Sequence, residues 1–436
     1  MASLLDTDLY KLTMQNAVRT LYPDAQAAYR FTNRTPSMKF NKAAYEHVKQ
    51  SIKALDSLRL SVEERLWLRR TCPYFPEDYL EWLSRFQLNS EKEVKVAFKQ
   101  EEGSEFGELD IAIEGQWSHV ILYEVPLLAI LSESYFLHVD TNWDYVGQLA
   151  LAKSKGKELL SQGIVFSEFG TRRRRSYDAH KIVMQGLIDA RNELTGDGTL
   201  RGKLTGTSNV HMARLFNVNP VGTIAHEWIM GIAAMEGYEG SNARALQQWE
   251  AVYPDGALRV ALTDTFSTRP FFHDLRSHPE LAKRWNGLRQ DSGDPFEFIG
   301  VVVNLYKDLG IDPSTKNIVF SDSLDVKKAV ALAKAAAKAG VGCSMGVGTF
   351  FTNDFPLRDK PNKRNADGSG PLPTETEKSK PLNIVIKLYK INGESCVKIS
   401  DEMTKTTGDL EAVKMVKHRF GLDQQGVLDS EPQITT

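Results

Sequence analysis

The chain has 436 residues, of which 42% are hydrophobic and 25% are charged, proportions typical of a globular protein with a large core and two or three domains. Its formal net charge of -2 gives none of the overall basic field by which many proteins attract nucleic acids. The three cysteines, Cys72, Cys343 and Cys396, lie far apart. This spacing argues against a zinc site or a disulfide framework and favours a reducing compartment.

The first residues carry no basic segment followed by an apolar one, so a secretory signal is not expected. We interpret the apolar stretches as shorter than the roughly 20 residues that a membrane-spanning helix needs. The sequence therefore predicts a cytoplasmic protein without a membrane partner.

The N-terminal third combines helices with a few short strands. Asp6 or Thr7 can cap a first helix that Pro23 ends, and residues 42–86 contain further helical patterns. Three strands and then a helix from Pro126 to about His138 are predicted next. The strands are Val94–Phe98, Leu109–Ile113 and His119–Tyr123.

From about residue 145, short apolar strands alternate with helical segments of a dozen or more residues. This alternation predicts βα units and a parallel sheet. A helix is expected from Asp325 to Ala339, because its Ala- and Lys-rich sequence ends at Gly340, a good C-cap residue. The predicted strands are Gly163–Phe166, Leu204–Gly206, Pro220–Ile224, Arg259–Leu262, Asn317–Phe320 and Gly342–Gly346.

The C-terminal part begins with a polar segment, residues 356–380, which we interpret as a mobile surface loop because it contains almost nothing apolar. Strands Asn383–Tyr389 and Ser395–Ile399 then form a predicted hairpin around Asn392-Gly393, a pair that suits a type I′ turn. Asp409 is expected to cap a last amphipathic helix that runs to about Phe420.

Polar, charged or glycine residues follow almost every strand of the alternating region. The carboxyl ends of parallel strands meet at one edge of a sheet or barrel, where α/β proteins build their active sites. Six such ends in succession therefore predict a site at this edge. They are Ser167–Arg175, Thr207–Asn209, His226-Glu227, Thr263–Thr265, Ser321–Ser323 and Gly346–Thr349.

A run of four arginines, Arg172–Arg175, lies between a predicted strand and a predicted helix. Cations are disfavoured at a helix N-terminus unless an anion binds there, and arginine grips phosphate with two parallel hydrogen bonds. The run therefore indicates a phosphate site. A solvated charge run and a nuclear-import patch are the alternatives.

Two further strand ends are typical of phosphate or ribose binding. In Val319–Asp325, serine hydroxyls and the N–H groups of a helix start can hold phosphate, and Asp322 can bind a ribose hydroxyl or Mg²⁺. An ordinary helix cap explains the same residues. Gly346–Thr349 allows a close approach of phosphate to the backbone, although glycines serve plain turns as well.

The loop Arg289–Pro295 and the residue His226 offer further chemistry. The loop carries two carboxylates that can hold Mg²⁺, and an Asp-Pro turn is the alternative reading. His226-Glu227 begins like the zinc-protease motif HExxH, but Met230 occupies the position of the second histidine and excludes that reading. His226 is then a base, a nucleophile or a structural residue.

Ten separated motifs, in order along nearly the whole chain, resemble the nicotinate phosphoribosyltransferase family, in particular its short fungal and bacterial forms. They are LLDTDLYKLTM (Leu4–Met14), YRFTNR (Tyr29–Arg34), FSEFGTRRRRS (Phe166–Ser176), GTSN (Gly206–Asn209), GTIAHEWIMG (Gly222–Gly231), ALTDTF (Ala261–Phe266), RQDSGDP (Arg289–Pro295), FSDSLD (Phe320–Asp325), GVGTFFTND (Gly346–Asp354) and PLNIVIKL (Pro381–Leu388).

The resemblance implies an α/β fold of the type II phosphoribosyltransferase kind, an irregular α/β barrel with a flanking α+β domain. Residues 1–140 would form the N-terminal part of the flanking domain, and residues 141–355 the barrel with the active site. After the mobile loop at 356–380, residues 381–436 would complete the flanking domain with a hairpin and a helix.

The resemblance also implies the reaction. The family transfers a phosphoribosyl group from phosphoribosyl pyrophosphate (PRPP) to nicotinate, giving nicotinate mononucleotide and pyrophosphate, in the salvage route to NAD. ATP is a co-substrate, as in a ligase, and Mg²⁺ is required. His226 matches the histidine that ATP phosphorylates transiently. Asp264 and Asp291 match catalytic carboxylates that bind ribose hydroxyls or Mg²⁺.

The substrate contacts are implied residue by residue. Tyr10 and Phe169 match the aromatic pair that sandwiches the pyridine ring, and Arg289 matches a residue near the ring's carboxyl group and the ribosyl phosphate. Ser208 stands where nicotinamide-using relatives carry Asp, which would repel a carboxylate, so Ser208 favours nicotinate. The phosphate-binding set comprises Arg172, Ser321, Asp322, Ser323, Gly346, Gly348 and Thr349.

Three alternatives remain at this point. One is a nicotinamide phosphoribosyltransferase, and another is a non-catalytic protein that binds sugar phosphates. The third is nucleic-acid binding through Arg172–Arg175, which the net charge does not favour. The sequence leaves open whether the protein is a monomer or a homodimer, and whether Tyr10 acts within one chain or between chains. A nuclear location in addition to the cytoplasm also stays open.

Overall fold

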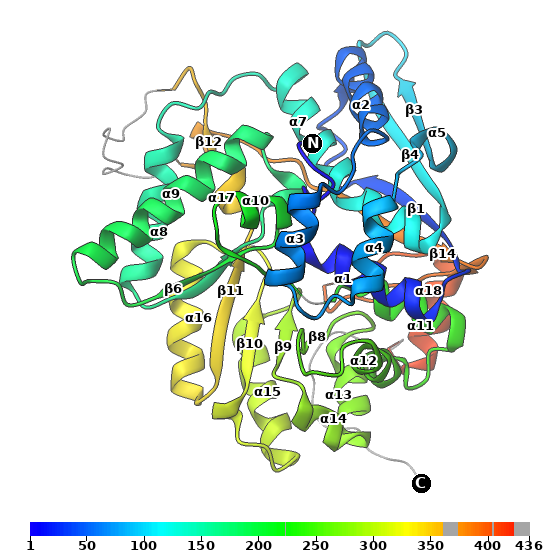
Figure 1. The fold of residues 1–436 in the computed structure, drawn as a ribbon, viewed down its shortest axis with the longest axis vertical. Coiled ribbons are helices and arrows are strands. Elements are labelled where there is room, and N and C mark those ends of the chain that lie inside the picture. The colour runs from blue at the N-terminus through cyan, green and yellow to red at the C-terminus, as the bar shows by residue number, and fades with distance from the viewer. Residues whose placement is uncertain (223, 361–373, 403–404, 423–436) are drawn as a thin grey trace.

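The structure, a computed structural model, describes residues 1–222, 224–360, 374–402 and 405–422. Two large sheets organise it, one antiparallel and one parallel, with helices packed around both (Figure 1). A third, two-stranded sheet is small. The site described below is built where the parallel sheet meets the N-terminal helix and the C-terminal strands.

The antiparallel sheet joins the two ends of the chain, because β1 pairs with both β4 and β14. Its strand order is β15-β14-β1-β4-β2, with β3 paired to β4. The strands are β1 (Gln26–Asn33), β2 (Phe40–Asn41), β3 (Val94–Gln100), β4 (Phe106–Gln116), β14 (Ile384–Ile391) and β15 (Glu394–Ser395). Pairing of segments more than 350 residues apart places the C-terminal strands beside the start of the chain.

The hairpin turn between β14 and β15 is confirmed, since Asn392 and Gly393 have φ values of 49° and 86°, as a type I′ turn requires. The second strand is shorter than predicted. Only Glu394–Ser395 pairs with β14, after which Lys398 forms a bridge with Thr407 and Ile399 with Phe266. The chain thus leaves the antiparallel sheet and turns toward the parallel one.

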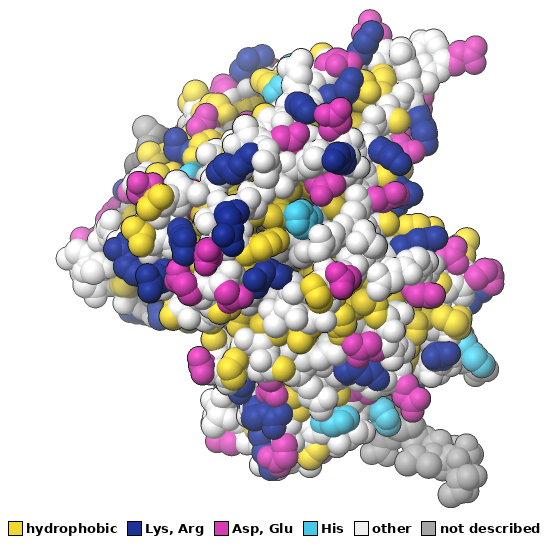
Figure 2. Space-filling view, turned by 45° about the vertical axis from the view of Figure 1, so that its right-hand side comes forward, with side chains coloured by type: hydrophobic (Ala, Val, Ile, Leu, Met, Phe, Trp, Pro, Cys, Tyr) yellow, Lys and Arg dark blue, Asp and Glu magenta, His cyan; other side chains and the backbone are white. Residues whose placement is uncertain are grey.

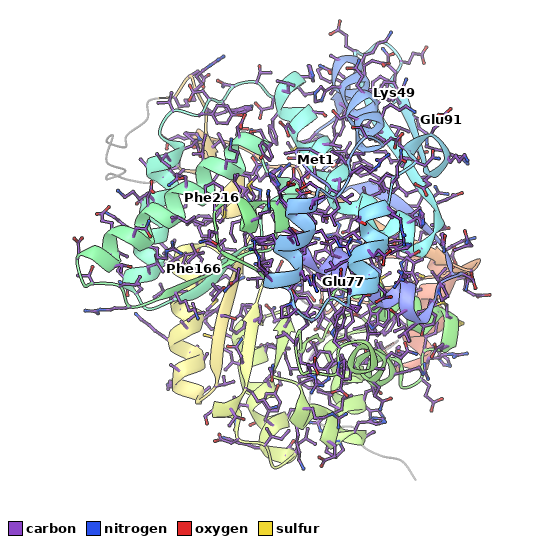
Figure 3. All side chains as sticks on the ribbon, in the orientation of Figure 1. Met1, Lys49, Glu77, Glu91, Phe166 and Phe216 are labelled. Atoms are coloured by element: carbon purple, nitrogen blue, oxygen red, sulfur yellow. The ribbon has the colours of Figure 1, made fainter. Side chains whose placement is uncertain are left out.

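The parallel sheet has seven strands in the order β7-β6-β5-β11-β10-β9-β8, and it curls into a half-barrel (Figure 1). The predicted α/β architecture is therefore confirmed. Phe166, labelled within this sheet in Figure 3, is fully buried and packs against Phe351. The strands are β5 (Val165–Glu168), β6 (Lys203–Thr207), β7 (Asn219–Pro220), β8 (Val260–Leu262), β9 (Gly287–Gln290), β10 (Asn317–Phe320) and β11 (Gly342–Val347).

Strand β9 was not predicted, because Gly-Leu-Arg-Gln contains one apolar residue and gives no apolar run. It is held by parallel pairing with β8 on one side and β10 on the other. Strand β7 is shorter than the predicted Pro220–Ile224, of which residue 223 lies outside the described residues. Tertiary pairing overrides local pattern at both strands.

Two N-terminal expectations were wrong in detail. The first helix, α1 (Leu9–Leu21), follows Asp8 rather than Asp6 or Thr7. The predicted strand His119–Tyr123 is helical, as α6 (Trp117–Val120) and η1 (Ile121–Tyr123), and α7 (Glu124–His138) follows. Short apolar runs that are buried on all sides do not distinguish helix from strand. The remaining N-terminal helices are α2 (Lys42–Leu55), α3 (Val62–Thr71), α4 (Glu77–Arg85) and α5 (Ser90–Glu93).

The segment Trp117–His138 is long and apolar enough to cross a membrane by length and composition, contrary to the expectation that no stretch was. However, 83% of its most apolar 18-residue window is buried inside the protein. Packing in the core accounts for its apolar character, as in the fully buried helices of large proteins.

Helices cover the parallel sheet, and α8 and α9 lie side by side (Figure 1), with Gly186 close to Ala152. The expected α16 is confirmed, since Asp325 caps it and Gly340 ends it with a φ of 76°. The helices are α8 (Gln148–Ser161), α9 (Tyr177–Gly196), α10 (Val210–Leu215), α11 (His226–Glu236), α12 (Ser241–Val252), α13 (Thr268–Ser277), α14 (Pro279–Arg284), α15 (Pro295–Asp308), α16 (Val326–Ala339), α17 (Thr349–Thr352) and α18 (Leu410–Arg419). Short 3₁₀ turns are η2 (Thr171–Arg173), η3 (Pro313–Thr315) and η4 (Glu375–Glu377).

The two ends of the predicted loop 356–380 are structured. Strand β12 (Phe355–Pro356) pairs with β13 (Lys378–Ser379), and Ser379 is buried against Arg175, which donates to its hydroxyl at 2.7 Å. Residues 361–373, to which the expected mobility applies, lie outside the described residues.

A buried ion pair ties the first residues to the parallel sheet. Both oxygens of Asp6 accept from Arg174, at 2.8 and 2.9 Å, and one also accepts from Asn209 at 2.8 Å. The side chains of Asp6 and Arg174 are fully buried. Burial alone would raise the pKa of Asp6, but Arg174 holds it well below its usual range.

We predict that Asp6→Asn lowers the free energy of unfolding by about 3–5 kcal/mol, because it leaves the Arg174 charge buried without its partner. Urea denaturation would measure the loss. The exposed pair Arg30–Glu114, 3.4 Å apart, is the control: Glu114→Gln should cost less than about 1 kcal/mol. Equal small effects of both substitutions would contradict the prediction.

Candidate active site

The ends of neighbouring parallel strands are held together beyond their last residues. The N–H of Phe169 donates to the carbonyl of Val347 at 2.8 Å, and the N–H of Ser208 donates to that of Glu168 at 2.8 Å. Farther along the edge, the N–H of Ser321 donates to Gln290 at 3.1 Å. These backbone bonds bring the predicted strand-end residues to one edge of the sheet.

His226 and two carboxylates form a compact cluster at this edge. The His226 Nδ1 lies 3.0 Å from the hydroxyl of Thr265, and its Nε2 lies 3.3 Å from Asp291 Oδ2 and 3.7 Å from Asp264 Oδ1. His226 is the first residue of α11, and Asp264 and Asp291 follow β8 and β9. The three predicted catalytic residues are therefore neighbours in space.

The cluster keeps its histidine neutral and its carboxylates charged. Burial, together with the cation of Lys398, lowers the pKa of His226 to about 4. Burial alone would raise the pKa of Asp264, but Lys398, with its Nζ 3.3 Å away, and His226 lower it. In the same way, Arg289 and His226 overcome burial and hold the pKa of Asp291 well below its usual range.

Arg289 connects this cluster to Phe169 and Ser321. Its guanidinium donates to Asp291 Oδ1 at 3.0 Å and to the Ser321 hydroxyl at 2.9 Å, and Ser321 donates to the same carboxylate at 2.7 Å. The guanidinium carbon lies 6.0 Å from the centre of the Phe169 ring. A planar cation and an aromatic ring thus share one wall of the site.

The ring of Phe169 lies directly against the glycine motif. A Cβ atom built on Gly346 would overlap the ring, and one on Gly348 would lie 3.0 Å from the carbonyl oxygen of Phe169. Gly346 is therefore required by the ring of Phe169, a constraint that the sequence did not suggest, whereas a side chain at position 348 would make a tight contact with the backbone. Thr349 begins the short helix α17 beside them.

The N-terminal segment lies against the end of β6. The N–H of Leu9 donates to the carbonyl of Ser208 at 2.8 Å, and the Ser208 hydroxyl donates to Asp8 Oδ1 at 2.7 Å. Tyr10 is in electrostatic contact with Arg172. One chain therefore brings its own Tyr10 to the strand ends.

The four arginines have different environments. Arg172 is partly exposed, 4.0 Å from Asp8 and 3.8 Å from Glu124. Arg173 donates to the carbonyl of Ile384 at 3.2 Å. Arg174 is buried against Asp6, and Arg175 is buried with its guanidinium carbon 3.6 Å from the centre of the Phe136 ring. Two of the four are thus structural, which excludes a solvated charge run or an import patch.

The predicted phosphate residues Asp322 and Ser323 lie next to a cation from the C-terminal part. Lys405 Nζ donates to Asp322 Oδ1 at 2.7 Å and lies 3.4 Å from the carbonyl oxygen of Asp291. Ser323 donates to Asp322 at 3.3 Å and has a φ of 48°, in the left-handed region. Asp322 is therefore held beside Asp291.

Sequence reasoning missed a set of cations that face these carboxylates. Burial and the neighbouring Lys398 lower the pKa of Lys387 to about 7, and burial lowers the pKa of Arg34. The Arg34 Nη2 is buried and has no hydrogen-bond partner among the described residues. Desolvated cations of this kind attract anions. The missed residues are Arg34, Lys387, Lys398 and Lys405; Arg34 and Lys387 lie in motifs quoted above, but no local pattern gave them a role.

The face shown in Figure 2 gives no support to nucleic-acid binding. Lysine and arginine side chains are interspersed there with acidic ones, without a wide basic area among the described residues drawn. Binding to a nucleic-acid backbone relies on concentrated positive charge.

The α/β half-barrel, with a carboxylate–histidine cluster and surrounding cations at its strand ends, fits the type II phosphoribosyltransferase class that the sequence motifs implied. Family models support this class: the nicotinate phosphoribosyltransferase family matches residues 164–424, and the N-terminal domain of the same family matches residues 5–132. The chain belongs to the nicotinate phosphoribosyltransferase family.

Individual relatives agree along the whole length. The nicotinate phosphoribosyltransferase of Saccharomyces cerevisiae is 40% identical over 428 residues, covering 97% of this chain and 96% of that protein. A solved structure from the same yeast has a TM-score of 0.90 at 40% identity and covers 97% of this chain and 98% of its own. The structure of the enzyme from Porphyromonas gingivalis has a TM-score of 0.84 at 34% identity, covering 97% and 100%.

We predict that Lys398→Met raises the pKa of His226 above its value of about 4, because the substitution removes a cation that repels the protonated imidazole. NMR of the imidazole resonances during a pH titration would measure this pKa, with the exposed His273 as a reference.

The lowered pKa of His226 also affects stability. Because an unfolded histidine binds a proton near its ordinary pKa of 6.5 and folded His226 does not, this residue lowers the free energy of unfolding as pH falls from about 6.5 to 4. A parent His226 that titrates at its ordinary pKa would contradict the assignment.

Proposed function

We propose that this protein transfers the phosphoribosyl group of PRPP to nicotinate, releasing pyrophosphate and nicotinate mononucleotide, and that ATP drives the reaction through His226. Family membership over both matched regions supports the transfer. The observation that carries the proposal is the cluster of His226, Asp264 and Asp291, surrounded by cations at the strand ends.

The cations suit the leaving group. When pyrophosphate departs, C1′ of the ribosyl group becomes oxocarbenium-like and negative charge develops on the departing oxygens. Preorganised cations stabilise such charge at no cost of reorganisation. Arg172, Arg34 and Lys387 are partly desolvated, and burial lowers the pKa of the last two. A bound anion with several negative charges, such as pyrophosphate, would neutralise these three side chains together.

The pyridine must be held in line with C1′, since positioning of two reactants supplies much of the rate enhancement of such transfers. Phe169 offers a flat surface fixed by Gly346, and Arg289 extends from it toward Ser321. In this proposal the ring of nicotinate stacks on Phe169, opposite Tyr10, with its carboxyl group near Ser208 and Arg289.

His226 is suited to accept a phosphoryl group. Its pKa of about 4 leaves the ring neutral at physiological pH, and a neutral imidazole keeps a lone pair on one nitrogen. In the proposed step an N–P bond forms at His226 while the bond between the γ-phosphorus and the ADP oxygen breaks. Hydrolysis of the phosphohistidine then couples ATP to product formation through differential binding.

Asp264 and Asp291 fit a magnesium ion. Mg²⁺ prefers carboxylate oxygens and usually keeps several waters. The Asp264 Oδ1 is buried without a hydrogen-bond partner among the described residues, and ligand atoms of His226, Asp264 and Asp291 lie within 4.8 Å of one another. A bound ion would neutralise charge on the phosphates of PRPP or ATP.

The rival functions are less well supported. A nicotinamide-using enzyme is disfavoured by Ser208 and by the names of the relatives. A non-catalytic protein that binds sugar phosphates would need the cations, but it gives no reason for a neutral histidine between two charged carboxylates. Product identification with nicotinate and PRPP, with nicotinamide as competitor, separates the three.

We predict that His226→Ala abolishes the stimulation of nicotinate mononucleotide synthesis by ATP and the acid-labile phosphate on the protein. The expected loss follows from removal of the only proposed phosphoryl acceptor. Turnover with and without ATP, together with radiolabelled ATP, would measure both. His273→Ala, at an exposed histidine, should keep both signals. Retention of ATP stimulation in His226→Ala would refute the phosphohistidine.

We also predict that Arg172→Ala raises the KM for PRPP by about 10- to 100-fold, the loss expected from one charge-assisted hydrogen bond. Steady-state kinetics with PRPP as the varied substrate would measure it. Arg201→Ala, at an exposed arginine before β6, is the matched control. An unchanged KM and kcat in Arg172→Ala would remove Arg172 from the phosphate site.

A further inference from the structure

The residue that stands behind Ser208 is a buried carboxylate. Asp8 is 2% exposed and Ser208 5% exposed, and a distance of 2.7 Å joins Asp8 Oδ1 to the Ser208 hydroxyl. Ser208 follows β6, next to Phe169 after β5, because Glu168 pairs with Thr207. The absence of Asp at position 208 therefore does not remove negative charge from this part of the site.

The donors and acceptors of Ser208 and Asp8 do not match the carboxylate of nicotinate as long as Asp8 is ionised. A serine hydroxyl has one hydrogen to donate, and an ionised carboxylate only accepts. If Asp8 is ionised, Ser208 donates to Asp8 and has only acceptor capacity left for a ligand. An amide N–H would fit such a site. The carboxylate of nicotinate would receive no hydrogen bond from Ser208 and would meet the like charge of Asp8 in a buried environment.

We propose that Asp8 binds a proton when nicotinate binds, so that its carboxylic acid donates to Ser208 and Ser208 in turn donates to the carboxylate of nicotinate. Asp8 is then a specificity-determining residue that acts through Ser208 without touching the substrate. This inference rests on the proposed function, in which the carboxyl group of nicotinate lies at Ser208. The step is an acid–base one: ionised Asp8, nicotinate and one proton from solvent give the complex.

The surroundings of Asp8 favour the protonated form. Burial raises the pKa of Asp8, and the charge of Glu168 adds to the effect, while Arg172, Thr171 and Ser208 oppose it. Tyr10 also faces Asp8. In contrast, Asp264 and Asp291 are held charged by their cations. Arg172 lies 4.0 Å from Asp8. Once Asp8 is neutral, it no longer forms an ion pair with Arg172, and the guanidinium is available to bind a phosphate.

The inference predicts a selectivity that depends on pH. Nicotinamide is neutral and can donate to Ser208, so its binding needs no proton. Nicotinate binding takes up one proton, so its KM rises about tenfold per pH unit once the pH exceeds the pKa of Asp8 in the free enzyme, until the pKa in the complex is passed. The preference for nicotinate over nicotinamide therefore falls as the pH rises.

The test uses the whole enzyme, with nicotinate and nicotinamide as separate probes. Calorimetric titration with nicotinate in two buffers of different ionisation enthalpy counts the protons taken up, and steady-state kinetics from pH 6 to 9 gives the KM for nicotinate. At a pH where the KM for nicotinate rises with pH, the parent should take up close to one proton with nicotinate and none with nicotinamide. Asp8→Asn, whose amide donates to Ser208 without titrating, should take up none and should show a flat pH profile of KM.

Ser208→Ala removes the hydroxyl that relays the bond, and it should raise the KM for nicotinate about tenfold, with Asp8→Asn adding little to it in the double variant. No side-chain bond of Asp8 caps α1, so the isosteric Asn is compatible with the fold. If the variant fails to fold, the proton count of the parent decides alone. A parent that forms nicotinate mononucleotide but binds nicotinate without proton uptake at every pH from 6 to 9, and with a flat KM, overturns this inference and leaves the function intact. A parent that forms no mononucleotide at any pH overturns the function itself.

Discussion

The site depends on the balance of charge around two carboxylates, the buried Asp264 and the partly buried Asp291. Asp264 and Asp291 remain charged beside His226 because Lys398 and Arg289 neutralise them. The two cations come from different parts of the chain: Arg289 lies on β9 of the parallel sheet, whereas Lys398 follows the strands of the antiparallel one. An unpaired buried charge costs several kcal/mol. Docking of the two sheets is therefore a condition for the electrostatics of the site, and the bridge between Ile399 and Phe266 joins the segment of Lys398 to the segment that follows β8.

The sequence predicted most of the parallel sheet because its strands are short apolar runs separated by well-capped helices. Asn317–Phe320 and the helix ending at Gly340 are clear examples, since local pattern and tertiary packing agree there. The prediction from the sequence failed where local pattern and tertiary packing disagree. Strand β9 is polar and exists only because it lies between β8 and β10. His119–Tyr123 is apolar enough for a strand but continues a buried helical segment.

The residues of the site likewise fall into those that the sequence predicted and those that only the fold shows. His226, Asp264 and Asp291 follow predicted structure or quoted motifs, so their proximity was foreseeable. The cations Arg34, Lys387 and Lys405 were not, because nothing in their neighbouring residues separates them from surface lysines and arginines. Only the fold shows that they lie desolvated, or beside Asp322. The same holds for Gly346: glycine suggested a phosphate, whereas the structure shows the ring of Phe169 against it.

The N-terminal segment is the part whose importance local pattern conceals most, since three of its charges are buried in different parts of the protein. Asp6 holds Arg174, Asp8 holds Ser208, and Lys11 binds both Glu124 and Glu227. Glu124 lies 3.8 Å from Arg172, and Glu227 is next to His226 in α11. Opposite charges thus alternate from Asp8 through Arg172, Glu124 and Lys11 to Glu227. A proton on Asp8 would change the charge at one end of this series, and Glu227 at the other end is next to His226, so the series connects the surroundings of Ser208 with those of His226.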